Sequence, residues 1–346
     1  MRSKRIVVTG KGGPEVLKVV EEDVPEPGPG EIRIRVEAAG VAFGDVMRRR
    51  GVLAPRQAFT PGYDVVGLVD AIGKGVEGIE LDTRVAAMMP KVGFGGYSEH
   101  AVVPANLALR VPSSIEPIPA ICLGLNYVTA YQMLFRFTAP QAGERILIHG
   151  AAGGVGTALL QLGRHKGLEM YGTASAPKHD LVQELGATPI DYHTEDFVQR
   201  ILELTDDGVD YVYDPIGGKH LERSYQTLRR AGTLVYYGAS SDISQGMVGV
   251  GVGLLRLMGL KLRPSRRRVR MYMITMSKGC KPADCKRDWE HLLQLYLDGV
   301  VDPIVGATFP LERVAEAHAV MDRAGTRGKI VVLRGANLAD SAAILR

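Results

Sequence analysis

The chain has little of what secreted and membrane-spanning proteins depend on. Its 346 residues include one tryptophan and three cysteines, Cys122, Cys280 and Cys285. Three thiols cannot build a disulfide framework, and the Cys280–Cys285 pair lacks the second pair that a structural zinc site requires. No uninterrupted apolar run reaches about 18 residues. The basic N-terminus becomes strand-like at once, without the apolar segment of a signal peptide. We therefore expect a cytoplasmic protein with no membrane span.

The charge balance excludes little but sets a preference among ligands. The formal net charge is +4, with 46% hydrophobic and 23% charged residues. A mild excess of positive charge suits a phosphate-bearing small molecule and does not require nucleic acid. The length is sufficient for two domains with cores of their own. We expect a two-domain protein that binds a small molecule and no nucleic acid.

The most informative motif is a glycine-rich loop, AAGGVG, at residues 151–156. A short apolar run, residues 146–148, precedes the loop. A helix-forming segment and a second strand-like run, residues 169–173, follow it. This is the order of a dinucleotide-binding βαβ unit, although Ala151 stands where the first glycine is usual. The pattern predicts that Gly153, Gly154, Val155 and Gly156 hold a pyrophosphate at the N-terminus of a helix.

The end of the second strand indicates which dinucleotide binds. NAD-binding folds place an acidic residue there, about 20 residues beyond the glycines, to bind the ribose 2′-hydroxyl. Here the segment reads GTASAPKH at residues 172–179, so a hydroxyl and a cation replace the acid. Ser175 and Lys178 would favour a 2′-phosphate, which predicts NADP(H). Alternatively, Ser175 caps the next helix and Lys178 is a solvated residue of its first turn.

The pattern of apolar residues divides the chain into parts. Residues 1–124 read as short strands separated by turns, and residues 32–36 alternate as a half-buried antiparallel strand does. From 125 to 277, strands alternate with helices, as in a parallel sheet. Candidate helices lie near 126–136, 157–166, 178–185, 195–205 and 221–230, and later near 283–298 and 311–323. The last strand is expected at 329–333, followed by a loosely held tail.

Residues 245–270 allow two interpretations. The first part is apolar and rich in glycine, and the second part is strongly basic from Lys261 to Arg270. The segment is either a buried helix followed by a solvated turn or a flexible apolar flap beside the active site. In the second case, the arginines would meet a substrate phosphate or an anionic surface. The glycines favour the flap, because each costs a helix about 1 kcal/mol relative to alanine.

Several segments together resemble the medium-chain dehydrogenase/reductase superfamily, in its zinc-free quinone oxidoreductase (zeta-crystallin-like) branch. They lie at residues 12–17, 27–31, 40–45, 61–67, 95–99, 129–131, 151–156, 214–218 and 328–329. Residues 125–238 are especially similar to vesicle-amine-transport-protein-1-like members. The resemblance implies an α/β fold with two domains. A Rossmann NADP-binding domain with a doubly wound parallel sheet would span 125–277, and a β-rich GroES-like catalytic domain would comprise 1–124 and 278–346.

The resemblance also implies site residues. Tyr192 would join Ser175 and Lys178 around the 2′-phosphate and its ribose, and Thr129 would lie by the nicotinamide ribose. The edge of the nicotinamide would be lined by Pro215, Ile216, Gly238, Ala239 and Ser240. Simpler roles are available for two of these: Thr129 can pack on or cap a helix, and Tyr192 can stack on a neighbour.

Departures from the family pattern bear on the chemistry. Zinc-dependent relatives carry a cysteine and a Gly-His-Glu where this chain has Gly44 and Gly62-Tyr63-Asp64. Without thiolate and imidazole we expect no metal. Tyr63 would then donate a hydrogen bond or a proton to the acceptor, unless it is only a packed aromatic. Ala42, Met47 and Leu53 replace the usual polar residues of quinone reductases, which moves the expectation toward bulkier, more apolar enones.

These observations predict an NADPH-dependent reductase of quinones or α,β-unsaturated carbonyl compounds, working without zinc. One alternative is an enoyl-thioester reductase, in which the arginines of 263–270 meet a CoA or carrier-protein phosphate. An alternative of another class is an NADPH-binding protein with little turnover that associates with a membrane surface or a partner. The β-prone run at 269–275 predicts a homodimer joined through a continuous sheet.

Overall fold

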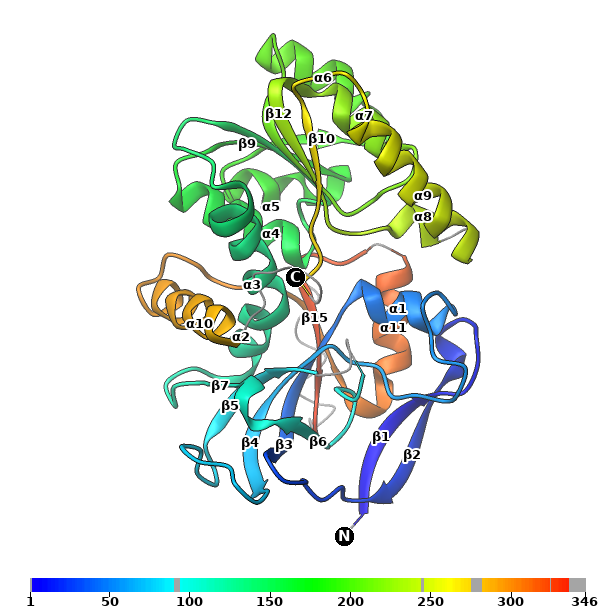
Figure 1. The fold of residues 1–346 in the computed structure, drawn as a ribbon, viewed down its shortest axis with the longest axis vertical. Coiled ribbons are helices and arrows are strands. Elements are labelled where there is room, and N and C mark those ends of the chain that lie inside the picture. Colours follow the sequence, from blue (N-terminus) through cyan, green and yellow to red (C-terminus); the bar gives the residue numbers. More distant parts are fainter. Residues whose placement is uncertain (1, 90–93, 244–245, 275–281, 324, 336–346) are drawn as a thin grey trace. The chain divides into compact units, whose positions relative to one another are not determined.

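The computed structural model describes residues 2–89, 94–243, 246–274, 282–323 and 325–335 (Figure 1). The chain forms two compact units. The first unit comprises residues 1–126 and 303–346, and the second comprises residues 127–302.

A parallel sheet of six strands organises the second unit, in the order β10-β9-β8-β11-β12-β13 (Figure 1). From the boundary between β8 and β11, successive strands are added toward β10 on one side and toward β13 on the other. That boundary is therefore the topological switch point of the sheet. Residues after β8 and β11 therefore meet at the carboxyl edge of the sheet. The strands are β8 (Arg145–His149), β9 (Glu169–Ala174), β10 (Thr188–Asp191), β11 (Val209–Asp214), β12 (Leu228–Tyr236) and β13 (Arg268–Met271).

Helices alternate with these strands between β8 and β13, as the alternating pattern predicted, and further helices precede β8 and follow β13. They are α3 (Val128–Tyr131), η4 (Gln132–Thr138), α4 (Gly154–His165), η5 (Ala176–Lys178), α5 (His179–Glu184), α6 (Phe197–Thr205), α7 (His220–Gln226), α8 (Ser240–Ile243), α9 (Gly246–Lys261) and α10 (Pro282–Leu297). The helix expected at 221–230 is shorter, because β12 begins at Leu228. Leu228 is buried in the core of the sheet together with Leu221 and Leu234, so burial decides its conformation.

The first unit is built on an antiparallel sheet in the order β14-β15-β3-β4-β5-β7, in which β6 also pairs with β3 and only β14 and β15 run parallel. Along β3, buried and half-buried residues alternate from Glu31 to Val36, which confirms the antiparallel strand expected at 32–36. The strands of this sheet are β3 (Glu31–Val41), β4 (Asp64–Ile72), β5 (Arg84–Met88), β6 (His100–Pro104), β7 (Ala108–Arg110), β14 (Val305–Pro310) and β15 (Lys329–Leu333). A separate antiparallel pair is formed by β1 (Arg2–Val8) and β2 (Leu17–Asp23). The helices are η1 (Pro14–Val16), α1 (Phe43–Arg49), η2 (Ala105–Leu107), α2 (Pro117–Cys122), η3 (Leu123–Tyr127), η6 (Leu311–Arg313) and α11 (Val314–Asp322).

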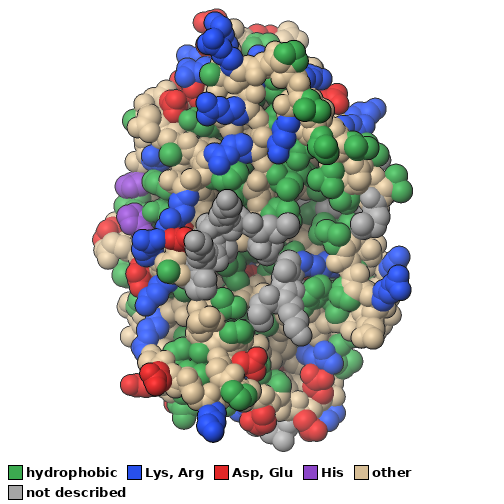
Figure 2. All heavy atoms as spheres, in the orientation of Figure 1, with side chains coloured by type: hydrophobic (Ala, Val, Ile, Leu, Met, Phe, Trp, Pro, Cys, Tyr) green, Lys and Arg blue, Asp and Glu red, His purple; other side chains and the backbone are tan. Residues whose placement is uncertain are grey.

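The segment at 245–270 differs from both interpretations. Residues 246–261 form the continuous helix α9, not a glycine-broken flap. Tertiary packing offsets the low helix propensity of its glycines, because Leu257 and Leu260 are 4% and 3% exposed in the core of the second unit. The helix is not buried all round either. Hydrophobic side chains gather on the surface over α9 in Figure 2, and Val248, Leu255 and Met258 are more than half exposed.

The boundary expected at residue 278 is also displaced. Helix α10 belongs to the second unit, which continues to Asp302. Polar contacts explain the assignment, because Asp288 on α10 accepts a hydrogen bond from Gln132 Nε2 at 2.8 Å and pairs with Arg136 at 2.6 Å. These partners lie on a neighbouring helix of the same unit, and no pattern in the sequence signals the pairing. The loose tail was expected from Arg334 onward. The Arg334 amide donates to the Glu37 carbonyl at 3.2 Å, and residues 336–346 lie outside the described residues.

One stretch, residues 117–138, is long and apolar enough to cross a membrane by length and composition, with a mean hydropathy of 1.3. In the structure, 72% of its most apolar window is buried. A core helix of a globular protein passes the same test, so the stretch is weak support for a membrane span.

Candidate functional site

The carboxyl edge of the parallel sheet collects most of the residues that the sequence singled out. The glycine loop follows β8, Ser175 follows β9, Tyr192 follows β10, Pro215 follows β11, and Gly238 lies shortly after β12. Ligands of open α/β sheets bind at this edge, beside the switch point. The fold therefore brings together residues that are up to 87 positions apart, between Gly153 and Ser240.

The glycine loop has the shape of an anion cradle. Gly150 has a φ of +66°, and the Gly153 amide donates to its carbonyl at 2.9 Å. A Cβ on Gly156 would overlap that same carbonyl and lie 2.6 Å from the Ala151 oxygen, so only glycine fits. Gly153 caps α4 without a side-chain bond, and the first turn carries no acid. The amides of Gly154, Val155 and Gly156 thus lie at a positive helix end without a capping side chain, which fits a pyrophosphate.

The replacement of the first motif glycine is compensated on β9. Ala151 is fully buried, and a Cβ on Gly172 would lie 2.6 Å from its methyl group. Glycine at position 172 leaves room for that methyl, so the loop keeps its approach to the strand; the Ala151 amide donates to the Thr173 carbonyl at 3.1 Å. The sequence showed both residues, but only the structure shows that one allows the other.

Ser175 and Lys178 directly follow the end of β9. The hydroxyl of Ser175 makes no capping bond to the turn that it precedes, which removes the capping alternative for this residue. Lys178 is half-buried, and its amide donates to the Ser175 carbonyl at 2.9 Å. Because Asp191 pairs with Ala174, the next residues, Tyr192 and Ser175, lie on adjacent strand ends. Tyr192 is 47% exposed, and its ring centroid is 4.3 Å from that of His193, so it does contact a neighbour.

The loops after β11 and β12 are joined to each other by hydrogen bonds. The Ser240 amide donates to the Pro215 carbonyl at 3.1 Å, and the Ser241 amide donates to the Ile216 carbonyl at 2.8 Å. A Cβ on Gly238 would lie 2.6 Å from the Pro215 oxygen. The five residues expected beside a nicotinamide, Pro215, Ile216, Gly238, Ala239 and Ser240, therefore form one continuous strip. Thr129, the remaining predicted residue of this unit, is buried on α3.

A buried polar network beneath these loops was not predicted. Asp214, the last residue of β11, accepts the amides of Ile216 at 2.7 Å and Gly217 at 3.0 Å through Oδ1. Its Oδ2 accepts the Ser224 hydroxyl at 2.7 Å and lies 3.0 Å from His220 Nδ1. The carboxylate thereby fixes the start of the Pro215–Ile216 strip. An aspartate before Pro-Ile-Gly-Gly was visible in the sequence, whereas the proximity of Ser224 was not.

His149 extends this network to the glycine loop. Its Nε2 is 3.1 Å from Ser224 Oγ, and its Nδ1 is 3.0 Å from Thr173 Oγ1. Since Ser224 donates its only proton to Asp214, the ring must donate to Ser224 from Nε2–H and accept from Thr173 at Nδ1. Burial lowers the pKa of His149 to about 3, the nearby His220 acts in the same direction, and the neutral ring matches this assignment.

Asp214 remains ionised in these surroundings. Burial favours its neutral form, but the hydrogen bonds from His220 and Ser224 and the nearby imidazoles outweigh that effect and lower its pKa to about 2. The ligand atoms of His149, Asp214 and His220 lie within 4.8 Å of one another, as in a metal site. Ser224 Oγ is 2.7–3.2 Å from all three, so the hydroxyl occupies the centre of the cluster. We interpret the cluster as a closed hydrogen-bond network.

Tyr63, the predicted donor, belongs to the first unit and is half-buried. A Cβ on Gly44 would overlap its hydroxyl and lie 2.7 Å from its Cζ, so the phenol ring fills the space of a side chain at position 44. Burial raises the pKa of Tyr63 to about 12, although the adjacent Arg48 opposes the shift. The phenol is therefore protonated at neutral pH and able to donate.

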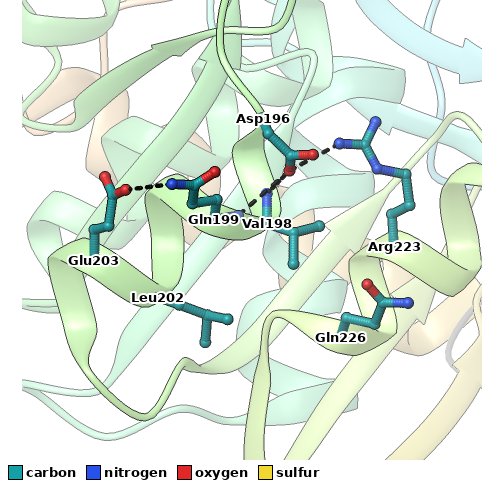
Figure 3. A pocket seen from close by; sticks show the side chains of 7 residues that line it. All are labelled: Asp196, Val198, Gln199, Leu202, Glu203, Arg223 and Gln226. Carbon is teal, nitrogen blue, oxygen red and sulfur yellow. Dashed lines mark hydrogen bonds and ion pairs between the residues drawn. The ribbon is translucent and has the colours of Figure 1, made fainter.

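A surface hollow beside α6 and α7 has different properties (Figure 3). Its polar side chains already bond to one another: Arg223 pairs with Asp196 at 2.9 Å, and Gln199 donates to Glu203 at 2.9 Å. Asp196 also caps α6. We assign no chemistry to this hollow. Its lining residues are Asp196, Val198, Gln199, Leu202, Glu203, Arg223 and Gln226.

Comparison with known proteins identifies the family. Residues 28–113 match the alcohol dehydrogenase GroES-like domain, and residues 185–332 match the zinc-binding dehydrogenase family. The Synaptic vesicle membrane protein VAT-1 homolog of Rattus norvegicus is 34% identical over 342 residues, covering 95% of this chain and 84% of that protein. The chain belongs to the medium-chain dehydrogenase/reductase superfamily. The expected fold, a Rossmann unit and a GroES-like unit, is thus confirmed.

Two further members of the superfamily bear on activity. The 2-haloacrylate reductase of Burkholderia sp. is 32% identical and covers 94% of this chain and 98% of its own. A solved structure of Escherichia coli quinone oxidoreductase complexed with NADPH has a TM-score of 0.87 and 29% identity, covering 95% of this chain and 99% of the other. This medium-chain dehydrogenase/reductase is therefore an oxidoreductase of the group that contains quinone oxidoreductases and VAT-1 homologues.

Proposed function

We propose that the chain is an NADPH-dependent reductase that transfers a hydride to quinones or α,β-unsaturated carbonyl compounds without a metal ion. The observation that carries the proposal is the cradle at the start of α4, with a serine and a lysine, instead of an acid, at the end of β9. Relatives named for quinone and haloacrylate reduction, and the NADPH complex of one of them, support the same assignment.

The residues of the second unit would bind and orient the cofactor. The amides of Gly154, Val155 and Gly156 would bind the pyrophosphate, and Gly153, whose own amide bonds to Gly150, would begin the cradle. Ser175, Lys178 and Tyr192 would bind the 2′-phosphate and ribose. Thr129 and the strip of Pro215, Ile216, Gly238, Ala239 and Ser240 would position the nicotinamide, which supplies the hydride when it is bound. Asp214 holds the Ile216 amide and thereby keeps the strip in place.

The first unit would supply the hydrogen-bond donor that stabilises the reduced acceptor. Hydride addition to a conjugated acceptor leaves a negative charge on its oxygen, and a protonated phenol such as that of Tyr63 stabilises such a charge by donating a hydrogen bond. The same ring explains why we propose zinc independence. It fills the space that a side chain at position 44 would occupy, and neither Gly44 nor Tyr63 provides a thiolate or an imidazole.

The test is NADPH oxidation by the purified full chain against a panel of quinones, enones, alkenals and enoyl-CoA esters. Turnover of quinones or enones is the expected result. Turnover of enoyl-CoA alone would favour the thioester alternative, for which the exposed arginines at 263, 266 and 268 are the candidate phosphate contacts. NADPH binding with no turnover of any acceptor would contradict the proposal.

The last outcome would favour the interaction alternative, in which α9 provides the contact surface. Its exposed apolar side chains adjoin the basic run after Lys261, a combination typical of surfaces that associate with anionic membranes. The rat and human relatives are named as vesicle membrane proteins. Cytoplasmic localisation accordingly stays a prediction.

We also propose a homodimer, joined at β13. This strand is the last of the six, and among the described residues it pairs only with β12. The sequence placed the pairing strand at 269–275, but the strand spans Arg268–Met271, so residues 272–274 lie beyond it and residue 275 lies outside the described residues. An open strand of this kind recruits a second chain readily.

A further inference from the structure

Ser224 joins the two strand ends beside which the cofactor site is built. It lies on α7 and is fully buried. Its hydroxyl donates to Asp214 Oδ2 at 2.7 Å and accepts a hydrogen bond from His149 Nε2 at 3.1 Å. His149 is the last residue of β8 and Asp214 is the last residue of β11, so the two partners flank the topological switch point. One side chain therefore links the strand before the cradle to the strand before the strip.

Thr173 continues this link from His149 to the cradle. Its hydroxyl donates to His149 Nδ1 at 3.0 Å and accepts the Gly150 amide at 3.4 Å. The Thr173 carbonyl accepts the next amide of the loop, that of Ala151. The Gly150 carbonyl in turn accepts the amide of Gly153, the residue that caps α4. The loop that would hold the pyrophosphate is therefore bonded through Thr173 to His149.

Asp214 continues the link on the other side, to the strip. Its Oδ1 accepts the amides of Ile216 and Gly217, and its backbone carbonyl accepts the Tyr237 amide at 3.0 Å. Tyr237 directly follows β12 and precedes Gly238, so this bond ties the second half of the strip to the first. The position of Asp214 therefore sets the position of both loops that would contact the nicotinamide.

The protons of these bonds all run in one direction. Each member of the chain accepts a hydrogen bond from the member before it and donates its own proton to the next. The chain begins at the Gly150 amide and ends at the Asp214 carboxylate, and the members between them are Thr173, His149 and Ser224. Hydrogen bonds in such a chain polarise one another, so each is strengthened by the others. Replacing one member should therefore weaken the contacts at both ends.

We propose that Ser224 is a positioning residue that couples the cradle to the strip, so that the pyrophosphate and the nicotinamide of NADPH bind cooperatively. A pyrophosphate that orders the loop at Gly150 would also order the chain of bonds, and with it the carboxylate that holds the strip. The nicotinamide then meets a strip that is already in place, so less ordering accompanies its binding. The inference rests on the nicotinamide position of the proposed function and is independent of which acceptor is reduced.

Two ligands separate the halves of the site. Calorimetry with the full chain compares NADPH with 2′-phospho-ADP-ribose, which has the pyrophosphate and the 2′-phosphate of NADPH but no nicotinamide. We expect Ser224→Ala to raise the Kd of NADPH by about 10-fold, the lower end of the range for a hydrogen bond to a charged group, because His220 still donates to Asp214. The Kd of 2′-phospho-ADP-ribose should rise by less than about 3-fold, because Thr173 still bonds to the loop at Gly150.

A double-mutant cycle tests the coupling itself. Thr173→Val removes the hydroxyl between His149 and Gly150, and alone it should raise the Kd of NADPH by about 3- to 10-fold. In the Ser224→Ala background the same change should raise the Kd by less than about 2-fold, because the chain is already broken. Two losses that simply multiply would show that the two ends are held independently, and would overturn the inference.

Thr205→Val is the matched control for the loss of a buried hydroxyl. Thr205 is 2% exposed, and its hydroxyl donates to the Ile201 carbonyl at 2.6 Å, at the end of α6 and outside the chain of bonds. The control should change neither Kd by more than about 2-fold. Ser224→Thr keeps the hydroxyl and should bring the difference between the two ligands most of the way back to that of the wild type.

The direction of the chain can be measured in the wild type, without any replacement. Nitrogen NMR of the histidine side chains should find His149 neutral near neutral pH with its proton on Nε2, since Ser224 has no second proton to donate. A proton on Nδ1 would reverse the bonds to Thr173 and Ser224 and overturn the inference, as would equal losses of NADPH and 2′-phospho-ADP-ribose affinity in Ser224→Ala. Binding results as expected without turnover of any acceptor would instead refute the reductase proposal and leave this inference intact.

Discussion

The buried imidazole of His149 should make the stability of the second unit depend on pH. Its pKa is about 3 in the folded chain against 6.5 for the free side chain, chiefly because burial penalises the charged ring. The unfolded chain therefore takes up a proton first as the pH falls. The contribution of the neutral ring is fully present above pH 6.5 and is lost progressively between 6.5 and about 3.

The size of this loss in the free energy of unfolding follows from the difference between the two pKa values. Each pH unit below the unfolded pKa costs about 1.4 kcal/mol, so the free energy of unfolding should fall by about 2 kcal/mol between pH 7 and pH 5. Replacing His149 by Gln removes the titration and keeps an amide donor that can reach Ser224. The variant should therefore be less stable than wild type at pH 7, with a difference that shrinks by about 2 kcal/mol at pH 5.

The single tryptophan provides the assay. Trp289 is 1% exposed on α10, so its fluorescence during urea denaturation reports on the second unit. His165→Gln is the matched control, because His165 is exposed on α4 and its replacement should leave the pH dependence unchanged. Identical pH slopes for wild type and His149→Gln would refute the assignment of a neutral, buried ring.

Further predictions concern the cofactor, the loop, metal and assembly. Lys178→Ala should weaken NADPH binding by about tenfold or more and leave NADH binding nearly unchanged, because it removes a charge-assisted contact worth about 1.5–3 kcal/mol. Lys166→Ala is the control. Equal losses for both cofactors in Lys178→Ala, or a similar loss of NADPH binding in Lys166→Ala, would show that Lys178 is no phosphate ligand. Gly156→Ala should lower the free energy of unfolding by about 1–3 kcal/mol through overlap with the Gly150 carbonyl, whereas Gly251→Ala, with open space at its Cβ, should not destabilise the chain. Elemental analysis of the purified protein should find far less than one zinc per chain, and a chelator should leave turnover intact; stoichiometric zinc that is lost together with activity would contradict this. Light scattering should show a dimer, and Met271→Pro should shift it toward monomer. The reason is that the Tyr272 amide bonds to β12, so the Met271 amide points to the open side of β13, where a second chain would accept it. A wild-type monomer at micromolar concentration would reject the pairing.

The sequence alone determined the features that depend on local order along the chain. The glycine loop between two strand-like runs predicted the Rossmann unit, because a tight turn before a helix requires those residues at that spacing. The missing acid after the second strand indicated the cofactor, and the alternation at 32–36 identified an antiparallel strand. The replacement of metal ligands by Gly44 and Tyr63 could also be read from the sequence, since the type of ligand atom is a property of each single residue.

Only the tertiary structure decided the features that depend on residues far apart. Gly172 leaves room for the methyl of Ala151, and Ser224 reaches His149 from 75 residues away. Helix α9 forms despite its glycines because the core buries Leu257 and Leu260. The helix propensities of single residues do not include such tertiary burial. Nothing in the sequence marks Arg48 as a buried residue, yet it is 5% exposed. Its burial between Tyr63 and Phe94 is set by packing across the first unit, because a side chain's environment is a property of the fold and not of its neighbours in sequence.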